Sequence, residues 1–262
     1  MMSHMDIVQI TDLHFGASVD SLLAGINPVD SFISVLEAID LGGRGDNLLL
    51  LSGDLSGECS PQSYKILNQI LKEQKKDVIW LPGNHDDVEL MANHLVDFPR
   101  QRVNDVGDWS IITLDSAQLG TPVGHINDNE LMLLSELLDQ VKGRPVLFSM
   151  HHCPIALDCP WLDKQKINNP EKLYQLLTSF DNVKAVVTGH VHQQYDGFWG
   201  QLPLFTAPSS CIQFKRYSQQ FAISNQKPGY RWFSLESTGL LSTGVEFLTD
   251  FNQSPDTASE GY

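Results

Sequence analysis

Short apolar runs, each bounded by polar or turn-forming residues, recur along most of the chain. Continuous apolar runs of about four to eight residues are typical of strands that are covered on both faces. We therefore predict strands at the runs Asp6–Thr11, Leu48–Ser52, Val78–Leu81, Ile111–Leu114, Val146–Met150 and Lys184–Thr188.

Segments with the apolar spacing of amphipathic helices lie between these runs. Within Ser31–Leu41, four apolar residues fall on one helical face: Phe32, Val35, Leu36 and Ile39. The same spacing predicts helices at Ser63–Leu71, Leu131–Val141 and Pro170–Phe180. Alternating strands and helices indicate a layered α/β fold.

The pattern changes after Gly200, where short strand-like segments follow one another without convincing helices between them. These segments are LPLFTAP, SSCIQF, YRWFSL and GVEFL. We expect antiparallel strands that complete a second sheet rather than an independent domain. The polar segment NQSPDTASEGY then predicts a disordered tail at 252–262, after a single domain at 1–251.

Polar side chains of a restricted kind follow five of the predicted strands. In layered α/β folds, ligands bind outside the carboxyl ends of strands, where the loops converge. We therefore expect these side chains to meet at one place. They are Asp12 and His14, Asp54, Asn84 and His85, His151 and His152, and His190 and His192.

The residue types predict metal ions. Carboxylate and amide oxygens and imidazole nitrogens are ligands for divalent ions such as iron, manganese, zinc and cobalt. Seven such ligands and a spare histidine exceed the needs of one ion, whereas two ions about 3.5–4 Å apart would use them all. The i, i+2 spacing in DLH and GHVH directs alternate side chains of extended backbone to one side. Glycines 53, 83 and 189 fit sharp turns at such a centre.

Composition narrows the class of protein. The net charge of −15 and the absence of a basic stripe argue against nucleic-acid binding. No run approaches the roughly 18 apolar residues of a membrane helix, and the N-terminus lacks secretory-signal features. Cys59, Cys153, Cys159 and Cys211 have neither disulfide-framework nor zinc-finger spacing, so we expect reduced thiols in a cytoplasmic protein.

The ordered set D-x-H, G-D, G-N-H-D, H and G-H-x-H resembles the calcineurin-like metallophosphoesterase superfamily. Within this superfamily the chain resembles the class III cyclic nucleotide phosphodiesterases, in particular the bacterial 3′,5′-cyclic AMP phosphodiesterases of the CpdA type. The stretches that favour this branch are Leu22–Ile39, His151–Asp163, Gly189–Gly197, Ala207–Phe214 and Pro228–Arg231. The loop Phe15–Ser18 is shorter than in many relatives, which leaves the substrate preference open.

The resemblance implies a four-layer α-β-β-α sandwich, with two mixed sheets flanked by helices. It also implies two divalent ions per chain, iron and/or manganese before zinc or cobalt. One ion would be held by Asp12, His14, Asp54 and His192, and the other by Asp54, Asn84, His151 and His190, with Asp54 bridging.

The expected reaction is hydrolysis of 3′,5′-cyclic AMP to 5′-AMP by a hydroxide that bridges the two ions. His85 would face the phosphate and protonate the leaving oxygen, with Asn84 beside it in the catalytic set. Contacts to the substrate would come from His14, Asp54, Asn84, His85 and His192.

Supporting roles are expected for neighbouring residues. His152 and Asp86 would support the ligands or their loop, Asp87 would only be solvated, and Asp115 and Ser116 would hold a loop. His4, His94 and His125 lie outside the set and are expected to have no part in the site.

Two other functions remain open. A broader metallophosphoesterase could act on glycerophosphodiesters, 2′,3′-cyclic nucleotides or phosphomonoesters, because metals recognise only the phosphate. A metal-free scaffold of the same fold is a further alternative, although every ligand position is filled by a competent residue. The expected partner is a small cyclic nucleotide, with no nucleic acid or membrane, and the protein would be a monomer or a homodimer.

Overall fold

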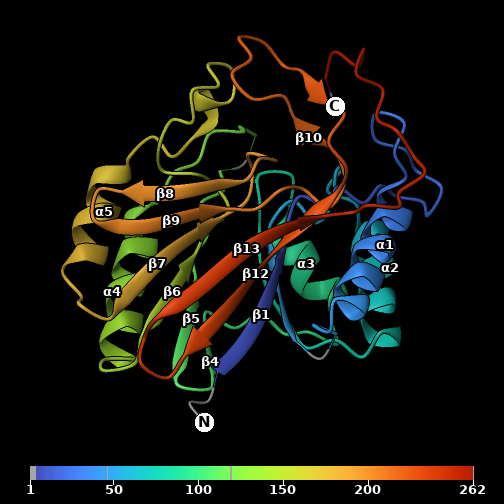
Figure 1. Ribbon diagram of the computed structural model, residues 1–262. Coiled ribbons are helices and arrows are strands. Elements are labelled where there is room, and N and C mark those ends of the chain that lie inside the picture. Colours follow the sequence, from blue (N-terminus) through green and yellow to red (C-terminus); the bar gives the residue numbers. More distant parts are fainter. Residues whose placement is uncertain (1–3, 46, 119, 262) are drawn as a thin grey trace.

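The computed structural model describes residues 4–45, 47–118 and 120–261. Two sheets pack face to face, and helices cover their outer faces, with α1, α2 and α3 over one sheet and α4 and α5 over the other (Figure 1). The predicted four-layer α-β-β-α sandwich is confirmed.

The first sheet contains five strands in the order β13-β12-β1-β2-β3. Strands β1, β2 and β3 run parallel, whereas β12 is antiparallel to both β1 and β13. Their bounds are β1 His4–Ile10, β2 Leu48–Ser52, β3 Val78–Leu81, β12 Gly229–Glu236 and β13 Leu241–Phe247.

The second sheet contains six strands in the order β4-β5-β6-β7-β9-β8. The four central strands are parallel, and β4 and β8 are antiparallel edges. The bounds are β4 Val103–Val106, β5 Trp109–Thr113, β6 Val146–Ser149, β7 Val183–Thr188, β8 Tyr195–Trp199 and β9 Leu202–Thr206. A separate two-stranded pair joins β10 Gln213–Phe214 to β11 Ile223–Ser224.

Side chains cap the beginnings of α1 and α2. Asn27 accepts hydrogen bonds from the first turn of α1, and Ser60 does so for α2. Proline follows each cap, so both helices begin earlier than apolar spacing alone predicted. The bounds are α1 Pro28–Leu41, α2 Pro61–Glu73, α3 Val88–His94, α4 Asp128–Gln140 and α5 Pro170–Thr178, with a 3₁₀ turn η1 at Asp163–Gln165.

The C-terminal strands divide between the two sheets and the separate β10–β11 pair, so the prediction that they complete a second sheet is wrong in part. Strand β9 does join the second sheet, but it pairs parallel with β7 and not antiparallel as predicted. Its hairpin partner β8 pairs antiparallel with it and forms the edge of the sheet. Strands β12 and β13 instead extend the first sheet from β1. Pairing of this kind depends on distant contacts, which local apolar spacing does not encode.

The period-two alternation of the strands separates two apolar layers. Ile7, Leu50 and Ile79 of the first sheet face Trp109 and Ile111 of the second, and all five are buried. Intervening residues such as Val8 and Leu49 pack instead in the larger layer that includes the helices. This double burial explains the continuous apolar runs in the sequence.

The fully buried side chain of Arg231 joins the two sheets. It extends from β12, and its Nε donates to the carbonyl oxygen of Thr206 in β9 at 3.1 Å. Its Nη1 donates to Asp196 Oδ1 in β8 at 2.9 Å and to Thr243 Oγ1 in β13 at 3.0 Å. One guanidinium therefore satisfies polar groups on three strands and both sheets.

The tail after β13 lies against the segment before α1. Asp256 donates its backbone N–H to the carbonyl of Ala24 at 2.7 Å, and Gln253 Oε1 accepts from the backbone of Asn27 at 2.6 Å. The prediction of a disordered tail at 252–262 did not anticipate these two hydrogen bonds. That prediction and the assignment of a single domain at 1–251 both remain predictions. Residue 262 lies outside the described residues. Within the described ranges, none of the helices has the length and apolar character needed to cross a membrane.

Loss of the Arg231 bridge should destabilise the fold. Arg231→Leu should lower the free energy of unfolding by about 2–4 kcal/mol, because buried carbonyls lose their donor. Asp196→Asn should cost about 1 kcal/mol or less, since the Asp196 side chain is 43% exposed and its charge is screened. Equilibrium urea denaturation measures both, and equal losses would contradict the assignment.

The Asp196→Asn comparison also has a predicted pH dependence. Burial raises the pKa of Asp196, but hydrogen bonds from Arg231 and Gln194 outweigh it and hold the pKa below its usual value. The charged carboxylate therefore stabilises the fold above the unfolded pKa of about 3.9, and this contribution is lost as the pH falls through the lower folded pKa. The difference between wild type and Asp196→Asn should be constant near pH 7 and disappear in acid.

Candidate metal centre

The strand ends that carry the predicted ligands meet at one edge of the sandwich. Strands β1, β2 and β3 of the first sheet contribute Asp12 and His14, Asp54, and Asn84. Strands β6 and β7 of the second sheet contribute His151, His190 and His192. The Asp and His ligands form groups in which ligand atoms lie within 4.8 Å of one another.

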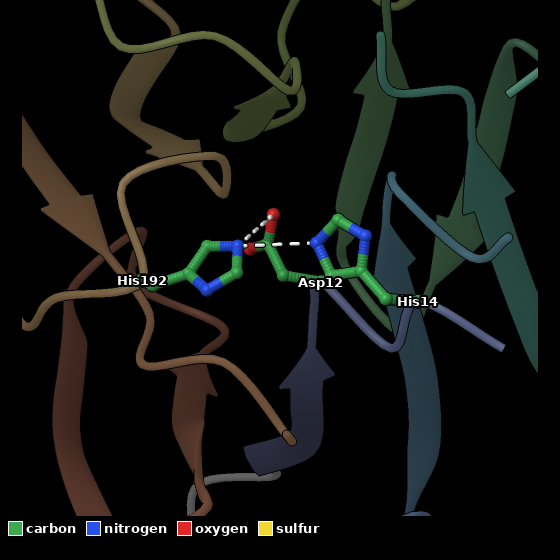
Figure 2. A group of neighbouring side chains, drawn as sticks. All are labelled: Asp12, His14 and His192. Carbon is green, nitrogen blue, oxygen red and sulfur yellow. Dashed lines mark hydrogen bonds and ion pairs between the residues drawn. The ribbon is translucent and has the colours of Figure 1, made fainter. Parts of the chain in front are cut away.

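The first group consists of Asp12, His14 and His192, all buried. Figure 2 shows their side chains pointing toward one another from the two sheets. His192 Nε2 lies 3.3 Å from Asp12 Oδ1 and 3.2 Å from His14 Nε2. Three ligand atoms thus converge on a space that one ion can occupy.

The second group consists of Asp54, His151 and His190, which are also buried. His151 Nε2 lies 3.3 Å from Asp54 Oδ2, and His14 Nε2 of the first group lies 3.8 Å from the same oxygen. Asp54 therefore contacts a member of each group, which is the arrangement that a bridging carboxylate requires.

Asn84 and His85 lie at the end of β3, beside this second group. They line one cavity together with Asp54 and His190. The backbone N–H of His85 donates to Asp54 Oδ1 at 2.9 Å, and His85 Nδ1 lies 3.1 Å from the carbonyl oxygen of Gly57. His85 also forms a group of potential ligands with His14 and Asp54, so geometry alone does not exclude it as a ligand.

The hydrogen bonds around the site suit metal binding. His151 Nδ1 lies 2.8 Å from the carbonyl of Ser52, and His192 Nδ1 lies 2.7 Å from that of Ile212. A carbonyl accepts only from N–H, so each contact directs the lone pair of Nε2 into the site, as in many metal-binding histidines. Among the described residues, the buried Asn84 Oδ1 and His190 Nε2 have no hydrogen-bond partner. A cation would satisfy both atoms, so the residues fit two metal ions.

Burial and neighbouring charges together set the protonation of the site. It lowers the pKa of His14 and of His190 well below the usual value, so both imidazoles are neutral, as ligands must be. Burial also lowers the pKa of His151, but the carboxylates of Asp54 and Asp12 raise it to about 9. Burial raises the pKa of Asp54, yet His151 and the neighbouring histidines bring it well below the usual value.

Five of the predicted ligands have left-handed backbone, which non-glycine residues rarely adopt. The φ angles are 55° at Asp12, 53° at His14, 51° at Asp54, 68° at His190 and 46° at His192. Such conformations cost about 1–3 kcal/mol each and gather at functional sites. The turns redirect the chain at the strand ends, so that side chains two residues apart reach one centre. The predicted reason for the i, i+2 spacing, extended backbone, is therefore wrong at these positions.

Two glycines allow the loops to approach the ligands. A Cβ on Gly83 would lie 2.1 Å from Asp54 Oδ1, and one on Gly53 would lie 2.4 Å from His151 Nδ1. Gly53 also has a φ of +98°. A Cβ on Gly189 would meet Thr11 Oγ1 at 2.1 Å. The structure therefore supports a close approach at all three predicted glycines.

Comparison with known proteins identifies the family. A family model described as calcineurin-like phosphoesterase matches residues 5–194. The chain is 36% identical over 259 residues to the Escherichia coli K12 protein named 3′,5′-cyclic adenosine monophosphate phosphodiesterase CpdA, covering 98% of this chain and 94% of that one. It is 33% identical over 258 residues to the Pseudomonas aeruginosa protein of the same name, with the same coverage. This chain belongs to the calcineurin-like phosphoesterase family.

Solved structures agree with this family at the level of the fold. A dimetal phosphatase from Danio rerio superposes with a TM-score of 0.62 at 14% sequence identity, covering 91% of this chain and 98% of that one. At this identity the likeness shows the fold alone. The fold is thus supported by this superposition, and the two ligand groups by the positions of their side chains.

Asp86 holds the loop that carries Asn84 and His85 in this phosphoesterase. Its Oδ2 accepts from the backbone of Gly83 at 2.9 Å and of Leu55 at 3.1 Å. Its Oδ1 accepts from Ser56 N at 3.0 Å and from Tyr64 Oη at 2.9 Å. Burial and the Asp54 carboxylate raise the pKa of Asp86 to about 6. This carboxylate fastens the β3 loop to the β2 loop.

Other neighbours have defined structural roles. The prediction that Asp87 is only solvated is wrong, because its Oδ1 accepts from the backbone of Leu90 at 2.8 Å and caps α3. Asp115 accepts from the backbone of Ala117 at 2.9 Å, as expected for a residue that holds a loop. Ser116 Oγ lies 2.8 Å from His152 Nδ1, which fixes that ring beside His151. His152 is in neither ligand group.

Substitutions of Asp86 and of Asp87 should change the free energy of unfolding by different amounts. Asp86→Asn replaces an acceptor by an NH₂ group that faces donors, so it should lower the free energy of unfolding by about 1–3 kcal/mol. Asp87→Asn is the matched control and should change stability by a few tenths, because asparagine caps helices as well as aspartate. Urea denaturation measures both, and a control loss as large as that of Asp86→Asn would contradict this account.

Proposed function

We propose that this phosphoesterase hydrolyses 3′,5′-cyclic AMP to 5′-AMP at a dinuclear metal centre. The observation that carries the proposal is the position of Asp54, which contacts both groups of buried ligands in a chain that matches cyclic AMP phosphodiesterases over 98% of its length. The substrate is taken from the names of these relatives.

The proposed ligands follow the two groups. Asp12, His14, Asp54 and His192 would hold one ion, and Asp54, Asn84, His151 and His190 would hold the other. When bound, two divalent ions withdraw charge from the phosphate and lower the pKa of water to about 7. The neutral amide of Asn84 leaves the site more positive than a third carboxylate would. This local charge allows a protein of net charge −15 to bind an anion.

The substrate phosphate would contact His14, Asp54, Asn84, His85 and His192. Hydrolysis breaks the bond between phosphorus and O3′, and O3′ needs a proton as it leaves. The Gly57 carbonyl accepts from Nδ1–H of His85, which holds the ring with Nε2 directed away from that carbonyl. His85 would therefore donate its Nε2 proton to O3′, and this assistance is typically worth about 10²–10⁴-fold in rate.

The proposal also covers the identity of the ions, the compartment and the oligomeric state. We propose iron and/or manganese as the native ions, with zinc and cobalt as alternatives, because histidine and carboxylate ligands suit all four. We also propose a cytoplasmic monomer or homodimer whose partner is the nucleotide. The four cysteines are free, as a reducing compartment requires.

Two substitutions test the division of roles. His85→Ala should keep both metals and lose about 10²–10⁴-fold in turnover of cyclic AMP. Asp54→Ala should lose both metals together with activity. Metal analysis of the purified variants and steady-state kinetics measure these outcomes. The matched control is His125→Ala, at a half-buried histidine outside both ligand groups whose Nδ1 lies 2.7 Å from Asn168 Oδ1, and this variant should match wild type.

Other outcomes would contradict the proposed roles or the proposed function. Wild-type rates for His85→Ala would overturn its role as the acid, and loss of metal from this variant would make it a ligand. Well under one ion per wild-type chain would favour a metal-free scaffold. Wild-type protein that hydrolyses bis-p-nitrophenyl phosphate but neither 3′,5′- nor 2′,3′-cyclic AMP would overturn the cyclic nucleotide assignment and favour the generic phosphodiesterase.

A further inference from the structure

A cavity of about 370 Å³ extends from the metal centre to an aromatic wall. At its inner end it is lined by Asp54, His85 and His190, and at the wall by Trp161, Phe214 and Phe221. Metal binding accounts for the side chains at the inner end only. The aromatic end suits a different ligand group, one with a large apolar surface.

The three aromatic rings form one rigid cluster. The Trp161 ring lies edge-to-face on Phe214, with centroids 5.0 Å apart, and on Phe221, at 5.3 Å. Phe214 also stacks on the imidazole of His192, with centroids 4.0 Å apart and an interplanar angle of 11°. The wall is thus in direct contact with a proposed metal ligand, and its distance from the centre is set by packing.

Two segments distant in sequence hold this wall in place. Trp161 precedes η1, and its Nε1 donates to Ser218 Oγ at 3.0 Å. Ser218 lies in the loop between β10 and β11, which Lys215 closes by donating its backbone N–H to Ala222 at 2.7 Å. Trp161 and Phe221 are only half-buried, whereas Phe214 is buried beneath them. The accessible part of the wall therefore comes from Trp161 and Phe221.

Gln165 adds a polar group at the same end of the cavity. Its backbone is fixed in η1, donating to Leu162 at 2.8 Å and accepting from Gly124 at 3.2 Å. A glutamine amide offers one donor and one acceptor side by side. Adenine presents a complementary donor and acceptor at its amino group and a neighbouring ring nitrogen, so this amide can hydrogen-bond to the edge of the base.

We propose that Trp161 and Phe221 form the nucleobase subsite of the enzyme and that Gln165 hydrogen-bonds to the edge of the base. This inference rests on the proposed function and assigns specificity within the same site. Flat bases of any kind stack on aromatic side chains, so the wall supplies affinity and the amide orients the base. The metals recognise the phosphate alone, and a separate base subsite is what distinguishes a cyclic nucleotide from other phosphodiesters.

The test compares cyclic AMP with methyl ribofuranoside 3,5-cyclic phosphate, which has the same cyclic phosphodiester but no base. For wild type we expect a KM for cyclic AMP at least about tenfold lower. Trp161→Leu should reduce this KM ratio about tenfold, and Trp161→Phe should restore part of it. Phe198→Ala, on an exposed aromatic side chain outside the cavity, is the matched control and should leave the ratio unchanged.

Gln165→Leu tests the amide independently of the aromatic cluster. It should raise the KM for cyclic AMP about tenfold and leave the KM for the base-free analogue unchanged, because only cyclic AMP loses a hydrogen bond. An unchanged KM for cyclic AMP would overturn the role of Gln165. This variant and the wild-type comparison remain decisive if Trp161→Leu shows no cooperative thermal unfolding.

The results separate this inference from the function on which it rests. Equal KM values of wild type for cyclic AMP and the base-free analogue would overturn the subsite and leave the phosphodiesterase activity standing. No hydrolysis of either compound by metal-loaded wild type would overturn the proposed function itself, and the subsite with it.

Discussion

The contact of Asp54 with both groups of buried ligands is the constraint on which the rest of the site depends. Its Oδ2 lies 3.3 Å from His151 and 3.8 Å from His14, and all three side chains are buried. Buried carboxylates and imidazoles at such distances need cations or protons to balance them. Two metal ions meet this need, and their position then determines where a phosphate can bind.

The two-sheet architecture is what brings these ligands together. His14 and Asp54 follow strands of the first sheet, and His151 follows a strand of the second, so the relative position of the sheets sets the distance between Asp54 and His151. The apolar layer between the sheets and the buried Arg231 bridge keep that position. The stacking of Phe214 on His192, and of Trp161 on Phe214, places the aromatic wall next to the proposed metal site.

Much of the fold and of the ligand set could be predicted from the sequence, because both depend on local patterns. Apolar runs covered on both faces identify strands, and parallel strand ends predict that Asp12, Asp54 and His190 converge. Features set by distant contacts could not be predicted. The left-handed backbone of the ligands and the division of β9 and β12 between two sheets leave no periodic signal. Strand β4 reads VNDV, which is too short and polar to stand out. Trp161 lies in a stretch that indicated the family but no function.

Anomalous diffraction from crystals grown with manganese tests the central claim most directly. The account predicts two anomalous peaks about 3.5–4 Å apart. Each should be within bonding distance of an oxygen of Asp54, one beside Asp12 and His192 and the other beside Asn84 and His190. A single peak at full occupancy, or two peaks of which only one contacts Asp54, would contradict it.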